Sequence, residues 1–290
     1  MRRLIHSSAA VLAMGLSSGC SGGGTGGAKG DSAQTKGASP TAVTITATDY
    51  AFELPTQIPA GVVTFKLVSR AKELHHAVVI RLDQGKTVDD MREAMREALK
   101  QPGPPPPWAH TVGGPNPSDP GGTSEATITM APGRYAVVCF IPSPGGPPHF
   151  TKGMIAGFEV TPAAGGQVDP PSDVSIQLSD YAFTFSSPLT AGTHRIRVEN
   201  NGPQPHEIAV VQLAPGKTTD DVVKWEAEGL KAPPPFTHFL GGVSPMDPNS
   251  SASFRVALEK GKYVVICFVP DAKDGHSHAA HGMIQQISVN

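Results

Sequence analysis

The stretch Ala136-Val137-Val138-Cys139-Phe140-Ile141 is a continuous apolar run that contains a cysteine. The stretch Val264-Val265-Ile266-Cys267-Phe268-Val269 has the same pattern 128 positions later. Short apolar runs without polar alternation are typical of strands that are buried on both faces, and we expect each cysteine to lie inside such a strand. Two of these runs at a fixed distance predict that one β unit occurs twice in the chain.

The repeat extends over most of the sequence. Asp49-Tyr50-Ala51-Phe52 recurs as Asp180-Tyr181-Ala182-Phe183, and Gly133-Arg134-Tyr135 recurs as Gly261-Lys262-Tyr263. Matching Ala-Gly, Gly-Gly and Asp-Pro pairs keep the same order between these motifs. We therefore expect two homologous domains, 42–162 and 173–290, joined by a Pro/Gly-containing linker over 163–172.

Within each unit the apolar pattern favours strands. Val43, Ile45 and Ala47 alternate with threonines, which predicts a half-buried strand. One helix is expected between Thr87 and Lys100, where apolar residues recur at helical spacing: Val88, Met91, Met95 and Leu99. The prolines at 104–107 would end this helix. The predicted fold class is all-β, with two tandem antiparallel sandwiches that each carry a short helical insertion.

Composition excludes several classes of function. The 290 residues include 32 glycines and 29 prolines, 17% are charged, and the formal net charge is −2. A nucleic-acid-binding protein needs a basic face, so nucleic acid is not an expected partner. No apolar run reaches the roughly 20 residues of a membrane-spanning helix, so we do not expect an integral membrane protein.

The N-terminus has the pattern of an export signal. Residues 1–20 combine a basic start, an apolar stretch and small residues before Cys20, and this pattern resembles a bacterial lipoprotein signal peptide with Cys20 as the lipidated residue. The alternative is an ordinary signal peptide with an incidental cysteine. Residues 21–41 are rich in Gly, Ser, Thr and Ala, which predicts a flexible tether. We therefore expect an extracytoplasmic lipoprotein, periplasmic or at the cell surface, whose contact with the membrane is the N-terminal anchor.

The two remaining cysteines have the same neighbours. Cys139 and Cys267 occupy equivalent positions of two domains, so they lie too far apart for a disulfide. An inert buried thiol or a thiol that links a dimer are the alternatives to a functional one. Each cysteine is followed by a His-x4-Met sequence, and each domain has a histidine at the start of an upstream strand. The two sets are His75, Cys139, His149 and Met154, and His206, Cys267, His278 and Met283.

A thiolate, two imidazoles and a weak thioether ligand are the donor set of a blue-copper electron-transfer site. On these residues, the sequence resembles the cupredoxin family, the plastocyanin-like blue copper proteins, over nearly all of both domains. The resemblance implies a cupredoxin-like Greek-key sandwich for each domain and one type 1 copper ion in each, held by the two sets above. One difference from the small electron carriers is a longer loop between the cysteine and the second histidine, which contains four prolines in the first domain.

Other histidines leave the ligand choice open. His76 competes with His75, and His276 and His281 compete with His278 or form an additional metal site. His110 and His238 are equivalent in the repeat and are interpreted either as loop residues or as residues that orient a ligand.

The first functional hypothesis is a one-electron carrier between redox proteins outside the cytoplasm. The alternatives are a lipoprotein that sequesters copper or delivers it to copper-handling proteins, and a degenerate, metal-free cupredoxin binding module. Copper nitrite reductases and multicopper oxidases need further histidine ligands, typically as His-Cys-His or as His-x-His on a strand. Because both cysteines are flanked by apolar residues, we expect neither of these enzymatic activities.

Overall fold

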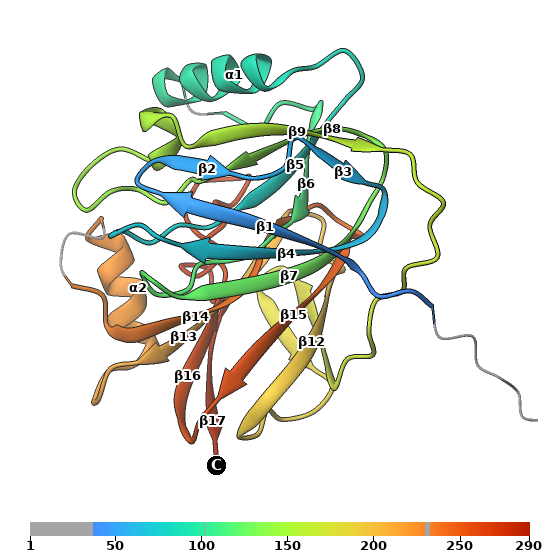
Figure 1. Cartoon of the computed structure of the whole chain (residues 1–290). Coiled ribbons are helices and arrows are strands. Elements are labelled where there is room, and N and C mark those ends of the chain that lie inside the picture. Colours follow the sequence, from blue (N-terminus) through green and yellow to red (C-terminus); the bar gives the residue numbers. More distant parts are fainter. Residues whose placement is uncertain (1–36, 102, 230–232) are drawn as a thin grey trace, which may run out of the picture. The chain divides into compact units, whose positions relative to one another are not determined.

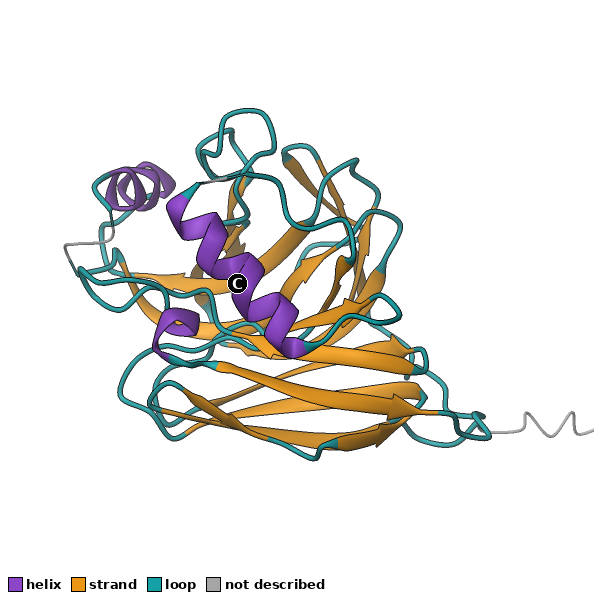
Figure 2. Ribbon diagram, turned by 90° about the horizontal axis from the view of Figure 1, so that it is seen from above, coloured by secondary structure: helices purple, strands orange, loops and turns teal. Residues whose placement is uncertain are grey.

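A computed structural model describes residues 37–101, 103–229 and 233–290. The predicted signal peptide, Cys20 and residues 21–36 of the predicted tether lie outside the described residues. Residues Gly37–Asn290 form one compact unit. Strands dominate this unit, and they are arranged in two sheets (Figure 1, Figure 2), so the predicted all-β class is confirmed.

The order of elements in the first half of the chain recurs in the second half. The first half contains β1 (Thr41–Thr48), β2 (Ala51–Glu53), β3 (Gln57–Pro59), β4 (Gly61–Ser69), β5 (Val78–Leu82), α1 (Val88–Lys100), β6 (Ala109–Gly113), β7 (Thr123–Met130), β8 (Gly133–Val138), the 3₁₀ helix η1 (His149–Lys152) and β9 (Ile155–Thr161). The second half contains β10 (Val174–Ser179), β11 (Ala182–Phe185), β12 (Gly192–Asn200), β13 (His206–Leu213), α2 (Thr219–Ala227), β14 (Phe236–Met246), β15 (Ser251–Leu258), β16 (Gly261–Ile266) and β17 (Ile284–Val289). The boundaries of the two domains stay a prediction.

Both sheets contain strands from both halves. One sheet has the order β11-β10-β12-β15-β7-β4-β1-β2, and the other has the order β17-β16-β13-β14-β6-β5-β8-β9-β3. The halves meet where β15 pairs with β7 and where β14 pairs with β6. The sheets are mixed rather than purely antiparallel, because β1 pairs in parallel with β4, and β10 with β12. This corrects the expectation of antiparallel sandwiches.

Reciprocal side-chain contacts reinforce this junction. His110, in the first half, lies 3.4 Å from a carboxylate oxygen of Asp247, in the second half. The equivalent histidine of the second half, His238, lies 2.6 Å from a carboxylate oxygen of Asp119, in the first half. The same histidine–aspartate contact therefore occurs twice across the junction, as expected for two halves related by an approximate two-fold rotation.

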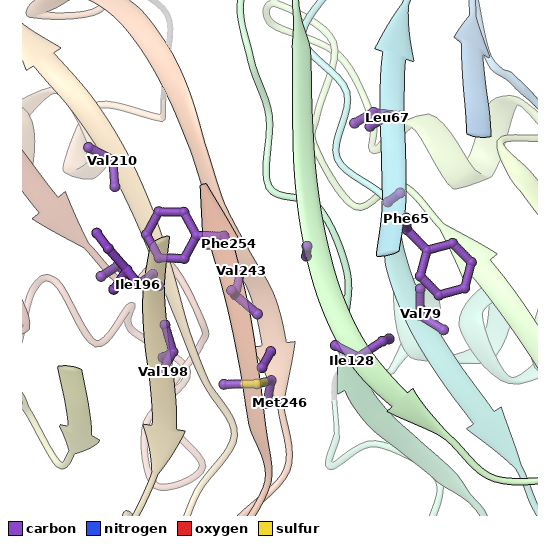
Figure 3. Close-up of a cluster of buried hydrophobic side chains, with 14 of the residues drawn as sticks. Phe65, Leu67, Val79, Ile128, Ile196, Val198, Val210, Val243, Met246 and Phe254 are labelled. Atoms are coloured by element: carbon purple, nitrogen blue, oxygen red, sulfur yellow. The ribbon is translucent and has the colours of Figure 1, made fainter. Parts of the chain in front are cut away.

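The core is filled by the inward-facing residues of both sheets. Val43, Ile45 and Ala47 are buried as their alternation predicts. Figure 3 shows this core: Phe65 and Ile128 come from one sheet and Val79 from the other, and residues from the second half belong to the same cluster. Burial of each large apolar side chain contributes about 1.5–3 kcal/mol, which holds the two sheets against each other.

The predicted helix is confirmed as α1, which starts after the N-cap Thr87 in a reciprocal capping box with Asp90. Met91 and Met95 are buried in the cluster that α1 forms with β8 and β9. Leu99 is 50% exposed, so the predicted apolar stripe ends one turn before the helix does. Among the described residues, no helix has the length and apolar character needed to span a membrane.

The two apolar runs around the cysteines form shorter strands than the sequence predicts. β8 ends at Val138 and β16 ends at Ile266, so each cysteine immediately follows a strand instead of lying inside one. The backbone leaves the ladder here because the next N–H bonds to a side chain: Phe140 N donates to His76 Nε2 over 2.8 Å. This irregular segment is where the histidines reach the thiols.

Candidate metal centres

The first group of donors surrounds Cys139. Its Sγ atom lies 3.8 Å from Nδ1 of His75 and 3.4 Å from Nδ1 of His149. All three side chains are buried. His75 precedes β5 and His149 begins η1, so the fold brings together residues 64 and 10 positions away from the cysteine.

The second group surrounds Cys267 with almost the same geometry. Its Sγ atom lies 4.0 Å from Nδ1 of His206 and 3.5 Å from Nδ1 of His278. In both groups the centroids of the two imidazole rings are 4.6 Å apart. Both cysteines are free thiols, as expected.

These distances fit a metal ion bound by all three donors. With metal–nitrogen and metal–sulfur bonds of about 2.0 and about 2.3 Å, ligands in a trigonal plane lie about 3.7 Å apart. The observed Sγ–Nδ1 separations of 3.4–4.0 Å bracket this value. The donor set of one thiol and two imidazoles is the one that suits copper.

Backbone hydrogen bonds place a methionine beside each group. Met154 accepts a hydrogen bond from Cys139 N over 3.2 Å and donates to the carbonyl of His149 over 3.2 Å. Met283 is held in the same way between Cys267 and His278, with distances of 3.1 and 2.8 Å. Both methionine side chains are fully buried. Each methionine backbone therefore adjoins its His-Cys-His group, and the role of its sulfur as a ligand stays a prediction.

Burial determines the protonation of the donors. It raises the pKa of the Cys139 thiol to about 12 and lowers the pKa of His75 to about 4. It likewise raises the pKa of Cys267 and lowers that of His278 to about 4. At neutral pH the imidazoles are thus neutral and ready to bind a cation, whereas each thiol keeps its proton until a metal ion displaces it.

Backbone N–H groups surround each sulfur atom. Cys139 accepts hydrogen bonds from the backbone of His76 and Ile141. Cys267 accepts them from Glu207, over 3.4 Å, and from Val269. Such hydrogen bonds favour the thiolate form of a buried cysteine and tune a metal bound to it.

A carboxylate fixes the orientation of one histidine in each group. Nε2 of His149 lies 2.8 Å from Glu73, and Nε2 of His206 lies 2.7 Å from Asp180. An ionised carboxylate only accepts, so Nε2 donates the proton and Nδ1 presents its lone pair to the thiol side. Burial raises the pKa of Glu73, but hydrogen bonds from Tyr50, His149 and Ser143 outweigh this effect and lower it to about 2.

A tyrosine lies against the second histidine of each group. The ring of Tyr50 lies 5.3 Å from that of His149, and its hydroxyl donates to Glu73 over 2.7 Å. The ring of Tyr181 lies 5.3 Å from that of His278, and its hydroxyl donates to Asp271. Sequence reasoning missed these residues, although the Asp-Tyr-Ala-Phe motif that contains both tyrosines is the strongest match of the repeat.

The competing histidines lie in different surroundings. His76 is buried, but its Nε2 accepts the Phe140 N–H, so this lone pair is already used. His276 is exposed, and His281 lies on the surface with its Nε2 3.2 Å from Asp274. His110 and His238 have Asp83, Asp247 and Asp119 as partners, at the junction of the two halves.

Comparison with known proteins gives structural matches only. No family model matches the sequence, and no curated protein sequence matches it. A dithionite-reduced auracyanin from Roseiflexus castenholzii matches with 21% identity over 43% of this chain and 100% of its own, at a TM-score of 0.31. A copper-containing nitrite reductase from Thermus scotoductus SA-01 matches with 13% identity over 86% of this chain and 61% of its own, at a TM-score of 0.23. A multicopper oxidase matches with 12% identity over 88% and 93%, at a TM-score of 0.24.

The donor groups of the structure correct the expectation that the chain has neither nitrite reductase nor multicopper oxidase activity. That prediction rested on the absence of adjacent histidines around each cysteine in the sequence. Folding instead brings distant histidines to each cysteine, giving the groups His75-Cys139-His149 and His206-Cys267-His278. The prediction was therefore wrong as an exclusion.

Proposed function

We propose that this protein is a copper-binding, one-electron carrier with one type 1 copper ion in each of its two centres. The observation that carries the proposal is the near-identical arrangement of a buried thiol between two Nδ1 atoms in both halves, at 3.4–4.0 Å. A buried methionine beside each group supports the same assignment, because a weak thioether ligand is part of such sites.

Bound copper would supply the one-electron couple, and the protein's residues would control it. Cys139 and Cys267 would bind as thiolates, His75, His149, His206 and His278 through Nδ1, and Met154 and Met283 as weak ligands. Burial of all of these side chains excludes water from the centres. The carboxylates of Glu73 and Asp180 hold two of the imidazoles in position, so little rearrangement would accompany a change of charge.

The proposal extends to location and partners. The predicted signal peptide with Cys20 and the tether predicted over 21–41 support an extracytoplasmic, membrane-anchored protein. The tether is shorter than predicted, because Ala38 pairs with Gln167 and β1 begins at Thr41. Phe140, next to Cys139, is 36% exposed and gives an apolar surface close to the first centre. Redox proteins that dock transiently are the proposed partners, since such encounters use small interfaces.

The test is titration of the full chain with cupric ion, followed by visible absorption. An intense thiolate-to-copper band that saturates at two equivalents is expected for wild type. Cys139→Ser and Cys267→Ser should each halve it, and the double variant should lose it. Absence of any band in wild type would contradict the proposal and leave a metal-free binding module. A band without reversible one-electron reduction would instead favour copper sequestration or delivery.

A further inference from the structure

Asn116 lies at the junction of the two halves and is 1% exposed. It follows β6, and its backbone N–H donates to the carbonyl of Gly242 over 3.3 Å. Its Nδ2 atom lies within hydrogen-bond distance of Ile208 O and Val243 O, at 3.0 and 3.2 Å. Residue 116 of the first half is thus anchored on strands β13 and β14 of the second.

On one side, Asn116 reaches the first centre through His76. The Asn116 side chain lies close enough to the His76 imidazole to act on its pKa as a hydrogen-bond partner. The same His76 accepts the Phe140 N–H over 2.8 Å and donates its own backbone N–H to Cys139 Sγ. The position of His76 therefore sets two hydrogen bonds at the cysteine.

On the other side, Asn116 reaches the second centre through Glu207. Asn116 Nδ2 donates to Glu207 Oε2 over 3.2 Å. Glu207 Oε1 accepts the Phe268 N–H over 3.0 Å, and the Glu207 N–H donates to Cys267 Sγ over 3.4 Å. His76 and Glu207 are equivalent residues of the repeat with different side chains that make the same backbone contacts.

A single side chain makes both connections. The residue equivalent to Asn116 is Ser244, whose Oγ donates to Asn116 Oδ1 over 3.3 Å. Among the described hydrogen bonds, Ser244 makes none to His76 or Glu207, so of these two equivalent residues Asn116 is the one that connects His76 with Glu207. The path from one cysteine to the other is buried, and hydrogen bonds in such surroundings are stronger than in water.

We propose that Asn116 is a positioning residue shared by both centres, through which metal binding at one cysteine changes the metal affinity and spectrum of the other. The identity of the metal rests on the function proposed above. A metal ion bound at one centre would displace the cysteine sulfur. The backbone N–H that donates to this sulfur belongs to His76 in the first centre and to Glu207 in the second, and the side chain of each contacts Asn116. Displacement of that residue is passed to its counterpart at the other centre.

The first experiment tests the connection without any metal. Amide hydrogen exchange at Phe140 and Phe268 is measured in the metal-free full chain, in wild type, in Asn116→Ser and in Thr111→Val. The control removes another hydrogen bond between the halves, from Thr111 Oγ1 to Asp247 over 2.6 Å, which touches neither centre. Asn116→Ser should speed exchange at both amides about tenfold, and Thr111→Val should leave them unchanged. Exchange that rises at only one amide, or equally in the control, overturns the shared role.

The second experiment measures how the connection through Asn116 affects copper affinity. The affinity of the second centre is determined in the full chain and in Cys139→Ser, where the first centre is disabled. We expect the two values to differ at least about fivefold, a difference that Asn116→Ser removes and Thr111→Val retains. The visible bands of both centres should also shift in Asn116→Ser. Equal affinities in wild type and Cys139→Ser overturn the coupling. A chain that binds no copper overturns the proposed function instead, and the amide measurement still decides whether Asn116 serves both centres.

Discussion

Nε2 of His206 lies 2.7 Å from a carboxylate oxygen of Asp180, whereas Nε2 of His75, its counterpart in the first half, has no hydrogen-bond partner among the described residues. The other histidine of each group shows the reverse. Nε2 of His149 lies 2.8 Å from Glu73, whereas Nε2 of His278 has no such partner and lies 3.8 Å from Asp271. The two centres have the same donor atoms, but a carboxylate holds the second histidine, His149, in one centre and the first histidine, His206, in the other.

This difference predicts that each carboxylate acts on its own centre. Glu73→Gln should weaken copper binding at Cys139 by about 10- to 100-fold, because a carboxylate that accepts from a ligand histidine orients it and increases its basicity. Asp180→Asn should have this effect at Cys267. The affinities are measured by visible titration in the Cys267→Ser and Cys139→Ser chains, so that one centre is observed at a time. Each variant is the control for the other, and an equal effect on both centres would contradict the assignment.

Copper affinity should rise with pH. The pKa of Cys139 is raised to about 12 by burial, so below that value copper must displace the thiol proton. The pKa of His75 is lowered to about 4, so above pH 4 this imidazole has no proton to lose. From about pH 5 to about pH 9 the affinity of the first centre should therefore increase about tenfold per pH unit, with one proton released per ion. Calorimetric titration of Cys267→Ser in buffers of different ionisation enthalpy measures this proton, and a pH-independent affinity would show that the thiol is not a ligand.

Gly242 should be essential for the packing of the strand that carries His206. It has φ of +131°, and a Cβ atom there would lie 1.9 Å from the carbonyl oxygen of Ile208. Gly242→Ala should thus lower the free energy of unfolding by at least about 2 kcal/mol, since backbone must move. Gly216→Ala is the matched control, because Gly216 also has positive φ, +77°, but no atom within 4 Å of the added Cβ. Denaturant unfolding compares the two, with a loss of about 1 kcal/mol expected for the control.

Local patterns in the sequence predicted much of the candidate site. The His-x4-Met sequences and the repeat identified Cys139 and Cys267 together with their histidines and methionines, because the complete set of donor residues occurs in both halves of the sequence. The helical spacing of Val88, Met91, Met95 and Leu99 predicted α1. Glu73 and Asp180 were out of reach, since they occupy different positions of the repeat and serve different histidines.

The junction of the halves could not be predicted either. The pairing of β7 with β15 and of β6 with β14 joins strand edges, and such pairing is made by backbone groups that every residue carries. Asn116 lies in a loop without apolar periodicity, so no pattern distinguished it. The cysteines were placed inside strands because Phe140 and Phe268 continue the apolar run, although their N–H groups bond to side chains instead of the ladder.

The reciprocal contacts at this junction are those of two identical subunits related by a two-fold axis. In a homodimer of that kind, any substitution beside one centre would appear beside the other. Within one chain the copies can diverge, and a histidine at 76 faces a glutamate at 207 across Asn116. Because both His-Cys-His groups belong to one chain, their surroundings can differ and their spacing does not depend on protein concentration.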